Sequence, residues 1–355
     1  MLKKRKWMYM LCVIIIVLLT SVYFNRQVLA SVGFDWFVQD RIEAGLKDSY
    51  KPVEGREPTP APTDAPKPEK EDPYSILLLG VDQRTSETGR SDTMLYTVVR
   101  PQDGNILMIS IPRDMYVELV GKDRSDKINA AYAYGGAGMA MDTVEKFLNS
   151  PVNHYATINF QGFRDVIDTL GGISLPITED IVNKDPLHEH FVIKANQDSY
   201  DGNDALNFVR YREDAGGDLS RTERQHEFLH AMIDKATNLK QWSKIPTLIG
   251  ILGDNFSTDI PPEKLVDLAQ SMLQQSNRNL YSHTMLGNGH RLVEGGPWYY
   301  FADEDDLAEV ETMIQSWLDA DTPAASLILP SEYASEQKEV QGPPSPDASA
   351  ATGTE

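Results

Sequence analysis

The most constraining feature of the sequence is an uncharged apolar run directly behind a basic cluster. Lys3, Lys4, Arg5 and Lys6 precede residues 7–24, which carry no charge. At about 1.5 Å of rise per residue, a helix over this run nearly crosses a hydrocarbon core of roughly 30 Å. We therefore expect a single-pass membrane anchor over 7–24, with residues 1–6 in the cytoplasm and the rest of the chain outside.

Two other readings of this run remain possible. A cleaved signal peptide would use Val28-Leu29-Ala30 as its small-residue end, although the apolar region is long for such a peptide. A buried core helix fits less well, because such helices seldom lack a polar face. The sequence thus predicts the lipid bilayer as a partner and a cell-membrane location, with the folded part on the extracellular side.

Composition divides the remaining chain into a linker, a domain and a tail. Residues 25–73 combine a juxtamembrane segment with a proline-rich stretch, which is typical of an extended spacer. The folded domain is expected over 74–319. Residues 320–355 are expected to form a disordered acidic tail, because their composition is poor in apolar residues and ends in a Pro/Ser/Ala/Gly-rich stretch.

Charge and cysteine content exclude several classes of protein. The net charge is −20, from 53 acidic and 33 basic residues, so a basic nucleic-acid-binding face is not expected. Cys12 is the single cysteine, which rules out an intramolecular disulfide and a thiolate zinc cluster. The sequence contains no HExxH, no GxxxxGK[ST] and no GxSxG, which argues against a zinc peptidase, a P-loop protein and an α/β-hydrolase.

Short apolar runs alternate with helical patterns in the expected domain. The fold class that this predicts is α/β, a layered α-β-α domain with a central mixed sheet behind one N-terminal transmembrane helix. The expected strands are 75–81, 93–99, 105–111 and 154–160, of which the second and third form a hairpin. The expected helices are 138–148, 161–170, 204–212, 220–239 and 262–273.

Charged residues adjoin the ends of three expected strands. Asp82 follows 75–81 and Asp92 precedes 93–99, so two carboxylates could hold Mg²⁺ jointly with phosphate oxygens, or simply line a solvated turn. Arg113 follows Pro112 at the end of 105–111 and would project from the rim of the sheet, or form a surface pair with Asp114. Ligands gather at the carboxyl ends of such strands.

Four arginines, at positions 210, 212, 221 and 224, fall within 15 residues of this acidic chain. Ser220 and Glu223 match a capping box, so Arg221 would lie in the first turn of a helix, where an anion is favoured. Gln225 would lie on the same stripe. A structural salt-bridge network with nearby acidic residues is one reading. An anionic ligand such as a diphosphate, held by forked guanidinium groups, is the other.

Seven motifs, in order, resemble the LytR-CpsA-Psr family of membrane-anchored cell-wall enzymes. They are Leu-Leu-Leu-Gly-Val-Asp at 77–82, Arg-Ser-Asp-Thr at 90–93, Ile-Ser-Ile-Pro-Arg-Asp at 109–114, Lys-Ile-Asn-Ala-Ala-Tyr-Ala-Tyr-Gly-Gly at 127–136, Gly-Gly-Ile at 171–173, Ala-Leu-Asn-Phe-Val-Arg-Tyr-Arg at 205–212, and Arg-Thr-Glu-Arg-Gln at 221–225. Any one motif would be unspecific. Together, and preceded by a basic N-terminus and one expected membrane span, the seven motifs are strong evidence for the resemblance.

The resemblance implies a phosphotransferase that moves a glycopolymer from an undecaprenyl-diphosphate carrier to peptidoglycan, usually at the 6-hydroxyl of N-acetylmuramic acid. It implies Mg²⁺ as cofactor. By motif, the magnesium-associated residues are Asp82 and Asp92, and the diphosphate-binding residues are Arg90, Arg113, Arg210, Arg212, Arg221 and Gln225. Of these, the resemblance assigns the chemistry to Asp82, Asp92, Arg113 and Arg221, and it places Arg84 and Arg224 beside the site.

Three rival functions belong to other classes. A transcriptional regulator would need a cytoplasmic, basic helix-turn-helix, which the expected anchor and the acidity oppose. A non-catalytic module that binds polyprenyl lipids or wall glycan would keep the arginines but would not need Asp82 and Asp92. A diphosphate hydrolase would use the same residues with water as the acceptor.

Overall fold

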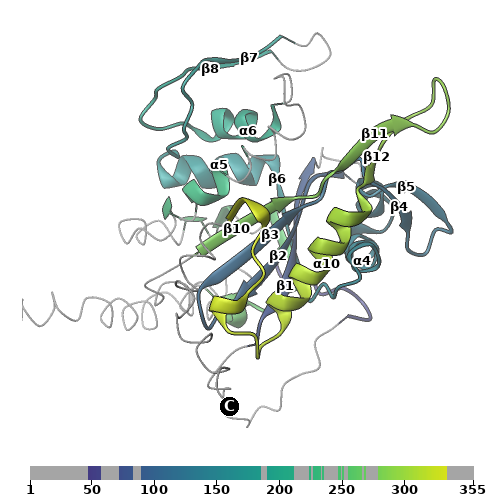
Figure 1. The fold of residues 1–355 in the computed structure, drawn as a ribbon. Helices are drawn as coiled ribbons and strands as arrows, with labels where there is room; N and C mark the ends of the chain where they lie inside the picture. The colour runs from purple at the N-terminus through teal and green to yellow at the C-terminus, as the bar shows by residue number, and fades with distance from the viewer. Residues whose placement is uncertain are drawn as a thin grey trace, which may run out of the picture.

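The protein folds around a six-stranded mixed sheet, as a computed structural model shows (Figure 1). The structure describes residues 47–56, 72–82, 89–184, 190–211 and 279–333, together with these parts of the intervening stretch: 224, 227–232, 234–235, 247–248, 250–251, 255–265 and 268. The expected span over 7–24 lies outside these residues. Among the described helices, none is long and apolar enough to cross a membrane.

The sheet has the strand order β10-β3-β2-β1-β6-β9. Its strands are β1 (Tyr74–Asp82), β2 (Arg90–Arg100), β3 (Asn105–Ser110), β6 (His154–Asn159), β9 (Phe256–Thr258) and β10 (Asn279–Thr284). Parallel pairing joins β1 to β6 and β3 to β10, and antiparallel pairing joins β1 to β2, β2 to β3, and β6 to β9. The expected central mixed sheet and the hairpin of β2 and β3 are therefore confirmed.

Both faces of β1 are apolar because helices cover the sheet on both sides. Leu77 and Leu79 belong to the main core, which they share with α4 (Asn129–Leu148) and α10 (Glu304–Leu318). Ile76 and Leu78 point the other way, toward a cluster that includes Leu265 on a helical segment. Figure 1 shows α4 and α10 side by side on one face. The layered α/β arrangement follows from this two-sided burial.

A second apolar cluster lies beside β6. It is formed by α5 (Phe160–Leu170), α6 (Gly202–Arg210) and the small hairpin of β7 (Ile181–Asn183) and β8 (Phe191–Ile193). The helix α5 ends where the sequence predicts, because Gly171 adopts φ 81°, a left-handed conformation that glycine tolerates. Asp201 caps α6 by accepting a hydrogen bond from the Asp204 N–H at 2.9 Å, so this helix begins before the expected residue 204.

Two further hairpins project from the sheet. One joins β4 (Tyr116–Leu119) to β5 (Arg124–Lys127), and the other joins β11 (Gly287–Arg291) to β12 (Trp298–Ala302). Both lie on the right-hand side of the view in Figure 1. Neither was expected from the sequence. The strands β4, β5 and β11 have only four or five residues and no continuous apolar run, whereas β12 is a continuous apolar run that the sequence analysis did not single out.

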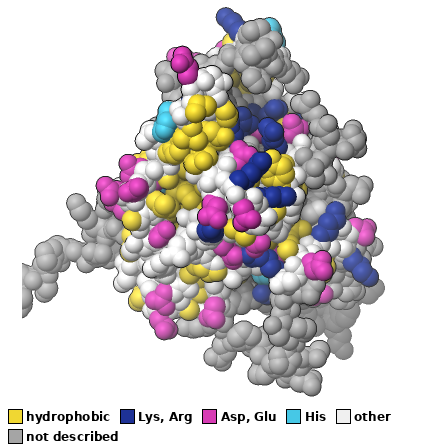
Figure 2. All heavy atoms as spheres, turned by 90° about the vertical axis from the view of Figure 1, so that its right-hand side faces the viewer, with side chains coloured by type: hydrophobic (Ala, Val, Ile, Leu, Met, Phe, Trp, Pro, Cys, Tyr) yellow, Lys and Arg dark blue, Asp and Glu magenta, His cyan; other side chains and the backbone are white. Residues whose placement is uncertain are grey.

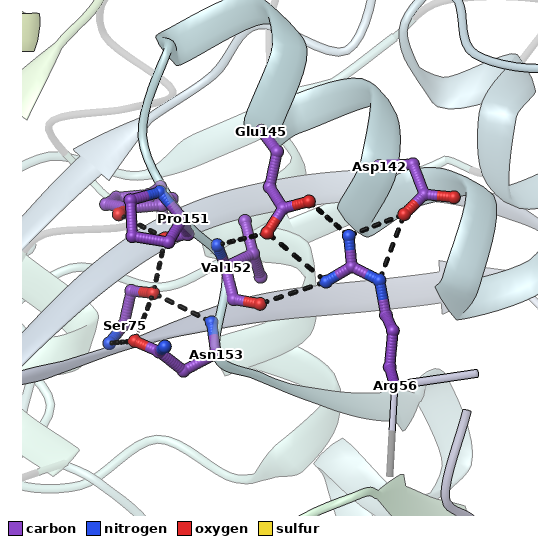
Figure 3. Close-up of polar contacts among 8 residues, drawn as sticks. Arg56, Ser75, Asp142, Glu145, Pro151, Val152 and Asn153 are labelled. Carbon is purple, nitrogen blue, oxygen red and sulfur yellow. Dashed lines mark hydrogen bonds and ion pairs between the residues drawn. The ribbon is translucent and has the colours of Figure 1, made fainter. Parts of the chain in front are cut away.

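Residues before the expected start of the domain at 74 also pack against it, which corrects part of the expected spacer over 25–73. Arg56 forms ion pairs with Asp142 and Glu145 of α4, and it donates a hydrogen bond to the Val152 carbonyl at 3.1 Å (Figure 3). The neighbouring Tyr50 makes a parallel bridge to Thr258 at the edge of β9. Residues 47–56 are thus packed against the sheet and α4, and residues 57–71 lie outside the described residues.

The domain also ends later than the expected residue 319. Leu327 is 2% exposed within the main core, and Trp317 donates its indole N–H to the Ile328 carbonyl at 2.8 Å. The last described residues form two short 3₁₀ turns, Ala324–Ser326 and Ser331–Tyr333, the second of which places Tyr333 against Tyr281 of β10. Residues 320–333 therefore belong to the domain, since they cover apolar surface that the sheet and α10 leave open.

The remaining expected helices differ in extent. The helix α4 starts at Asn129 rather than at 138, with a break at Gly135 and Gly136, whose backbone angles are not helical. Of the expected helix over 220–239, the described residues 224, 227–232 and 234–235 are helical. Of 262–273, residues 262–265 and 268 are helical. The rest of both segments lies outside the described residues.

Candidate functional site

The carboxyl ends of four strands lie at the same edge of the sheet. The pairing makes β1, β3, β6 and β10 run in one direction and makes β2 run against them. Asp82 ends β1, Arg113 follows β3 and Phe160 follows β6, so all three lie along this edge. The edge also receives the start of β2, with Arg90 and Asp92. The expected placement of Asp82 and Arg113 at the carboxyl ends of strands is confirmed, and this is where ligands bind in such sheets.

A β-bulge places Asp92. Thr93 pairs with Gly80 and Ser91 pairs with Val81, so Asp92 is an extra residue that has no partner position on β1. A bulge of this kind re-aims a side chain and increases the local twist. The Asp92 carboxylate consequently reaches the Arg113 guanidinium, with which it forms an ion pair. Two residues that are 21 positions apart in sequence thereby meet.

The ion pair extends into a short charged chain. Asp114 is 3.7 Å from Arg113 Nε through Oδ2, and its Oδ1 accepts a hydrogen bond from Lys127 Nζ at 2.6 Å. Among the residues that the structure describes, none accepts a hydrogen bond from the buried Arg113 Nε. A buried donor without an acceptor costs free energy, and the nearby Asp114 carboxylate offsets part of this cost through its charge. The expected surface pair with Asp114 exists, but Asp92 is the closer partner of Arg113.

Asp82 and Arg90 face each other across the first two strands. They are register partners at the end of the β1–β2 ladder, so their side chains lie on the same side of the sheet. Arg90 is exposed and Asp82 is half-buried. The sheet therefore presents two carboxylates and two guanidinium groups, Asp82, Asp92, Arg90 and Arg113, around one corner of its edge.

Arg210 approaches the same edge from α6. Its guanidinium lies over the Phe160 ring, 4.4 Å from the ring centroid, and Phe160 directly follows β6, the parallel neighbour of β1. A guanidinium stacked on a ring keeps its N–H groups available in the plane for an anion. Arg210 thus adds a third exposed or half-buried guanidinium beside the ends of β1 and β6.

Arg224 has a structural environment instead. It is 9% exposed, it donates to the Phe208 and Tyr211 carbonyls, and it lies over the Tyr211 ring. These carbonyls end α6, where the helix leaves acceptors without intrahelical partners. Arg224 consequently holds the end of the helix that carries Arg210.

The other expected site residues lie outside the described part of the chain; they are Arg84, Arg212, Arg221 and Gln225. Sequence reasoning missed Lys127 and the aromatic side chains of the two hairpins. Figure 2 shows the face that carries these hairpins, where acidic and basic side chains lie beside hydrophobic ones. The sequence signals for this face were the alternation of polar and apolar residues at 116–119 and the aromatic run at 298–301.

Known proteins resemble this chain in sequence and in fold. The polyisoprenyl-teichoic acid–peptidoglycan teichoic acid transferase TagU of Bacillus cereus is 34% identical over 288 residues, which are 81% of this chain and 92% of its own. The crystal structure of Bacillus subtilis TagV matches with a TM-score of 0.60 at 32% identity, over 72% of this chain and 100% of that one. A structure of TagT bound to LI-WTA matches with a TM-score of 0.55 at 28% identity, over 70% and 91%.

A model of the LytR_cpsA_psr family matches residues 40–316. The match begins before the first packed residues at 47–56 and ends within α10, so it covers both the sheet and the charged edge. Because the family model spans more than half of the sequence, and because TagU of Bacillus cereus is 34% identical over 81% of this chain, this chain belongs to the LytR_cpsA_psr family.

Proposed function

We propose that this chain is a phosphotransferase that attaches a glycopolymer to peptidoglycan. The donor is an undecaprenyl-diphosphate-linked glycopolymer, and the acceptor is the 6-hydroxyl of N-acetylmuramic acid. The observation that carries the proposal is the meeting of Asp82, Arg90, Asp92, Arg113 and Arg210 at one edge of the sheet. The names of the relatives support it, since TagU is called a teichoic acid transferase and TagT was solved with a wall teichoic acid ligand.

The guanidinium groups would bind the donor diphosphate. Arg113 offers a half-buried guanidinium, and Arg90 and Arg210 are exposed on either side. Guanidinium groups bind phosphate through pairs of parallel hydrogen bonds, which fixes orientation as well as charge. The expected contributions of Arg212, Arg221 and Gln225 belong to the same proposal. Positioning and charge neutralisation are the main sources of rate enhancement in phosphoryl transfer.

The carboxylates suit Mg²⁺ when it is shared with the substrate. Among the residues that the structure describes, no group of three or more acidic, histidine or cysteine side chains could hold a metal ion alone. Magnesium commonly takes one or two carboxylates together with phosphate oxygens and water, so Asp82 and Asp92 fit this mode. When bound, the ion would supply positive charge to the phosphate oxygens.

The reaction balances without ATP. The acceptor oxygen forms a bond to the phosphorus that carries the glycan, and the bond from that phosphorus to the bridging oxygen breaks. Undecaprenyl phosphate leaves with the bonding electrons, and the hydroxyl proton passes to one of the two carboxylates. Arg113 would stabilise charge on the phosphate oxygens, while its pairing with Asp92 keeps that carboxylate oriented.

The proposed location follows from the N-terminus. Residues 7–24 would cross the cell membrane once, with the basic residues before them in the cytoplasm and the domain on the extracellular side. This places the site on the side where the carrier's diphosphate meets peptidoglycan.

The test uses the full chain in detergent with a polyprenyl-diphosphate oligosaccharide, peptidoglycan oligomers and Mg²⁺, with products read by mass spectrometry. We expect a glycan–phosphate–peptidoglycan adduct that is lost with EDTA. Asp92→Asn should lower kcat by roughly 100-fold or more, because it removes charge where the transition state is held. The matched control is Asp180→Asn, which breaks an exposed pair with Lys194.

Three outcomes would contradict the proposal. Free glycan phosphate without the adduct would favour a hydrolase. Bound but unchanged donor would favour a lipid-binding module. An Asp92→Asn variant that transfers at the parent rate would show that the edge described above is not the catalytic site.

A further inference from the structure

The β11–β12 hairpin stands at the same edge as the charged site. It follows β10, whose carboxyl end lies beside that of β3, and it extends away from the body of the molecule (Figure 1). The Tyr300 N–H donates to the Asp114 carbonyl at 2.9 Å, and Met115 makes a parallel bridge to Tyr300. The hairpin is therefore joined by its backbone to the residue that follows Arg113.

One side of this hairpin carries aromatic rings that the core does not use. Tyr300 and Ala302 pack against the main core, so Tyr299 and Phe301 point to the opposite side of the strand. His290 stacks on Phe301 with centroids 4.1 Å apart and planes 18° from parallel. Tyr116 of β4 lies 4.8 Å from Tyr299 and 5.3 Å from Phe301. We call these four residues, Tyr116, His290, Tyr299 and Phe301, the aromatic face.

The aromatic face leads directly into the charged site. Tyr116 is the register partner of Lys127, which puts both side chains on one side of the β4–β5 hairpin. Lys127 Nζ is 2.6 Å from Asp114 Oδ1, and Asp114 adjoins the Arg113–Asp92 ion pair. The rings, Lys127, Asp114 and the Arg113–Asp92 ion pair therefore lie next to one another in this order.

The chemistry of this face suits a carbohydrate. Tyr116, Tyr299 and Phe301 are half-buried, and His290 is exposed. Partly exposed rings present flat apolar faces to the C–H faces of sugar rings. Polar groups stand among the rings, since His290 Nδ1 and Asn288 Oδ1 are 3.2 Å apart and both residues are exposed. Such groups can bond to the hydroxyl and N-acetyl groups of a sugar chain.

The position of the face distinguishes the acceptor from the donor. Arg210, which would hold the carrier diphosphate, lies on the β6 side of β1, whereas the aromatic face lies beyond β3 on the other side. In phosphoryl transfer, the attacking and leaving oxygens are roughly in line through phosphorus. An acceptor would consequently approach from the side opposite the carrier, which is the side of the hairpin.

We infer that the aromatic face binds the glycan strand of peptidoglycan, a chain of N-acetylated amino sugars, and holds its hydroxyl toward Asp92 and Arg113. This inference rests on the proposed function, because it assigns the acceptor of the proposed transfer. Its binding step, however, can be measured without any transfer taking place.

The experiment uses the full chain in detergent and short soluble peptidoglycan glycan strands as the probe. Binding is measured by saturation-transfer NMR and titration, and the KM values for acceptor and donor are measured separately. Tyr299→Ala should raise the acceptor Kd and KM about tenfold and leave the donor KM unchanged, since a stacked ring contributes up to that factor. Phe301→Leu, which keeps apolar volume but loses the flat ring, should act in the same direction.

The matched control is Trp298→Ala on the same strand. The Trp298 ring lies over Gly289 on the other side of the hairpin, as a Cβ at Gly289 would overlap it. This variant should leave the acceptor KM unchanged. Urea unfolding of all three variants verifies that the hairpin change has not unfolded the domain.

Four results decide the matter. An unchanged acceptor Kd in Tyr299→Ala and Phe301→Leu overturns the inference. A rise in donor KM alone assigns the face to the donor glycan and also overturns it. Loss of binding to phospholipid vesicles, with glycan binding intact, makes the face a membrane contact instead. Tyr299-dependent glycan binding by a protein that forms no adduct supports the inference while refuting the proposed transfer.

Discussion

His283 on β10 is a buried histidine whose partners are all acidic. Its Nε2 is 2.8 Å from Asp306 Oδ1, and the other oxygen of Asp306 accepts the Leu286 N–H at 2.7 Å. Burial would lower the pKa of His283, but the hydrogen bond and charge of Asp306, with further charge from Glu332 and Glu309, raise that pKa above its usual value. The folded protein therefore holds this proton more tightly than the unfolded chain.

This shift predicts that stability falls as pH rises. A raised folded-state pKa contributes stability that is fully present below the unfolded value, about 6.5, and that is lost as pH passes through the folded value. Urea unfolding of the protein from pH 5 to 9 should show this loss, and His283→Gln should flatten it. The control is His190→Gln at an exposed position. A parent slope retained in His283→Gln would contradict the assignment.

At the scale of elements, local signals were reliable where they were strong. The strand over 75–81 and the helix stop at Gly171 were predicted, because a continuous apolar run and a left-handed glycine each specify one conformation. The start of α4 was not predicted, because Gly135 and Gly136 interrupt its pattern and the structure continues through a break. In the two outer hairpins, β4, β5 and β11 lack any apolar run long enough to recognise, whereas the run of β12 was overlooked.

The residues of the candidate site also divide into those that local signals predict and those that depend on the whole fold. Asp82 and Arg113 were predictable, since each directly follows an apolar strand. The bulge that turns Asp92 toward Arg113 depends on the register of two strands, which composition does not reveal. The contact of Tyr116 with Tyr299 joins residues that are far apart in sequence, so it depends on the whole fold.

The N-terminus of α10 gives a prediction at this scale. Asp303 caps the helix by accepting hydrogen bonds from the Asp305 and Asp306 N–H groups at 3.0 and 3.1 Å. Asp303→Ala should lower the free energy of unfolding by about 1 kcal/mol. Asp305→Ala removes the same charge from the first turn without the cap, and should cost only about 0.3–0.5 kcal/mol. Urea unfolding of both variants measures the difference, and equal losses would refute the capping role.

At the scale of the whole molecule, both ends of the domain are held by contacts that composition did not predict. Arg100 is 5% exposed, and its guanidinium donates to the Trp317, Asp319 and Thr322 carbonyls at 2.7 to 3.0 Å. Leu327 then covers the core beyond α10. Composition alone could not place these residues, because acidic segments can pack through a few apolar side chains and their carbonyls.

These contacts predict different stabilities for two fragments. A fragment of residues 47–333 should unfold cooperatively. A fragment of residues 74–319 loses Leu327 and Arg56, and should be less stable by about 3 kcal/mol or more, since deleting one buried leucine side chain alone costs about that much. Urea unfolding followed by tryptophan fluorescence measures this. The fragment 47–319 separates the two ends, and equal stability of all three would contradict these boundaries.

If the domain is tethered at its N-terminal end, as proposed, the ion pairs of Arg56 affect where tension enters the domain. These ion pairs with Asp142 and Glu145 of α4 come before β1 along the chain (Figure 3). A tension applied from that end first reaches β9, through the backbone pairing of Tyr50 with Thr258, and then α4, through Arg56. It therefore enters the body across these elements rather than along β1. The tension therefore does not pass along β1, whose far end is Asp82. The distances between the charged groups at that edge are preserved while the tether is pulled.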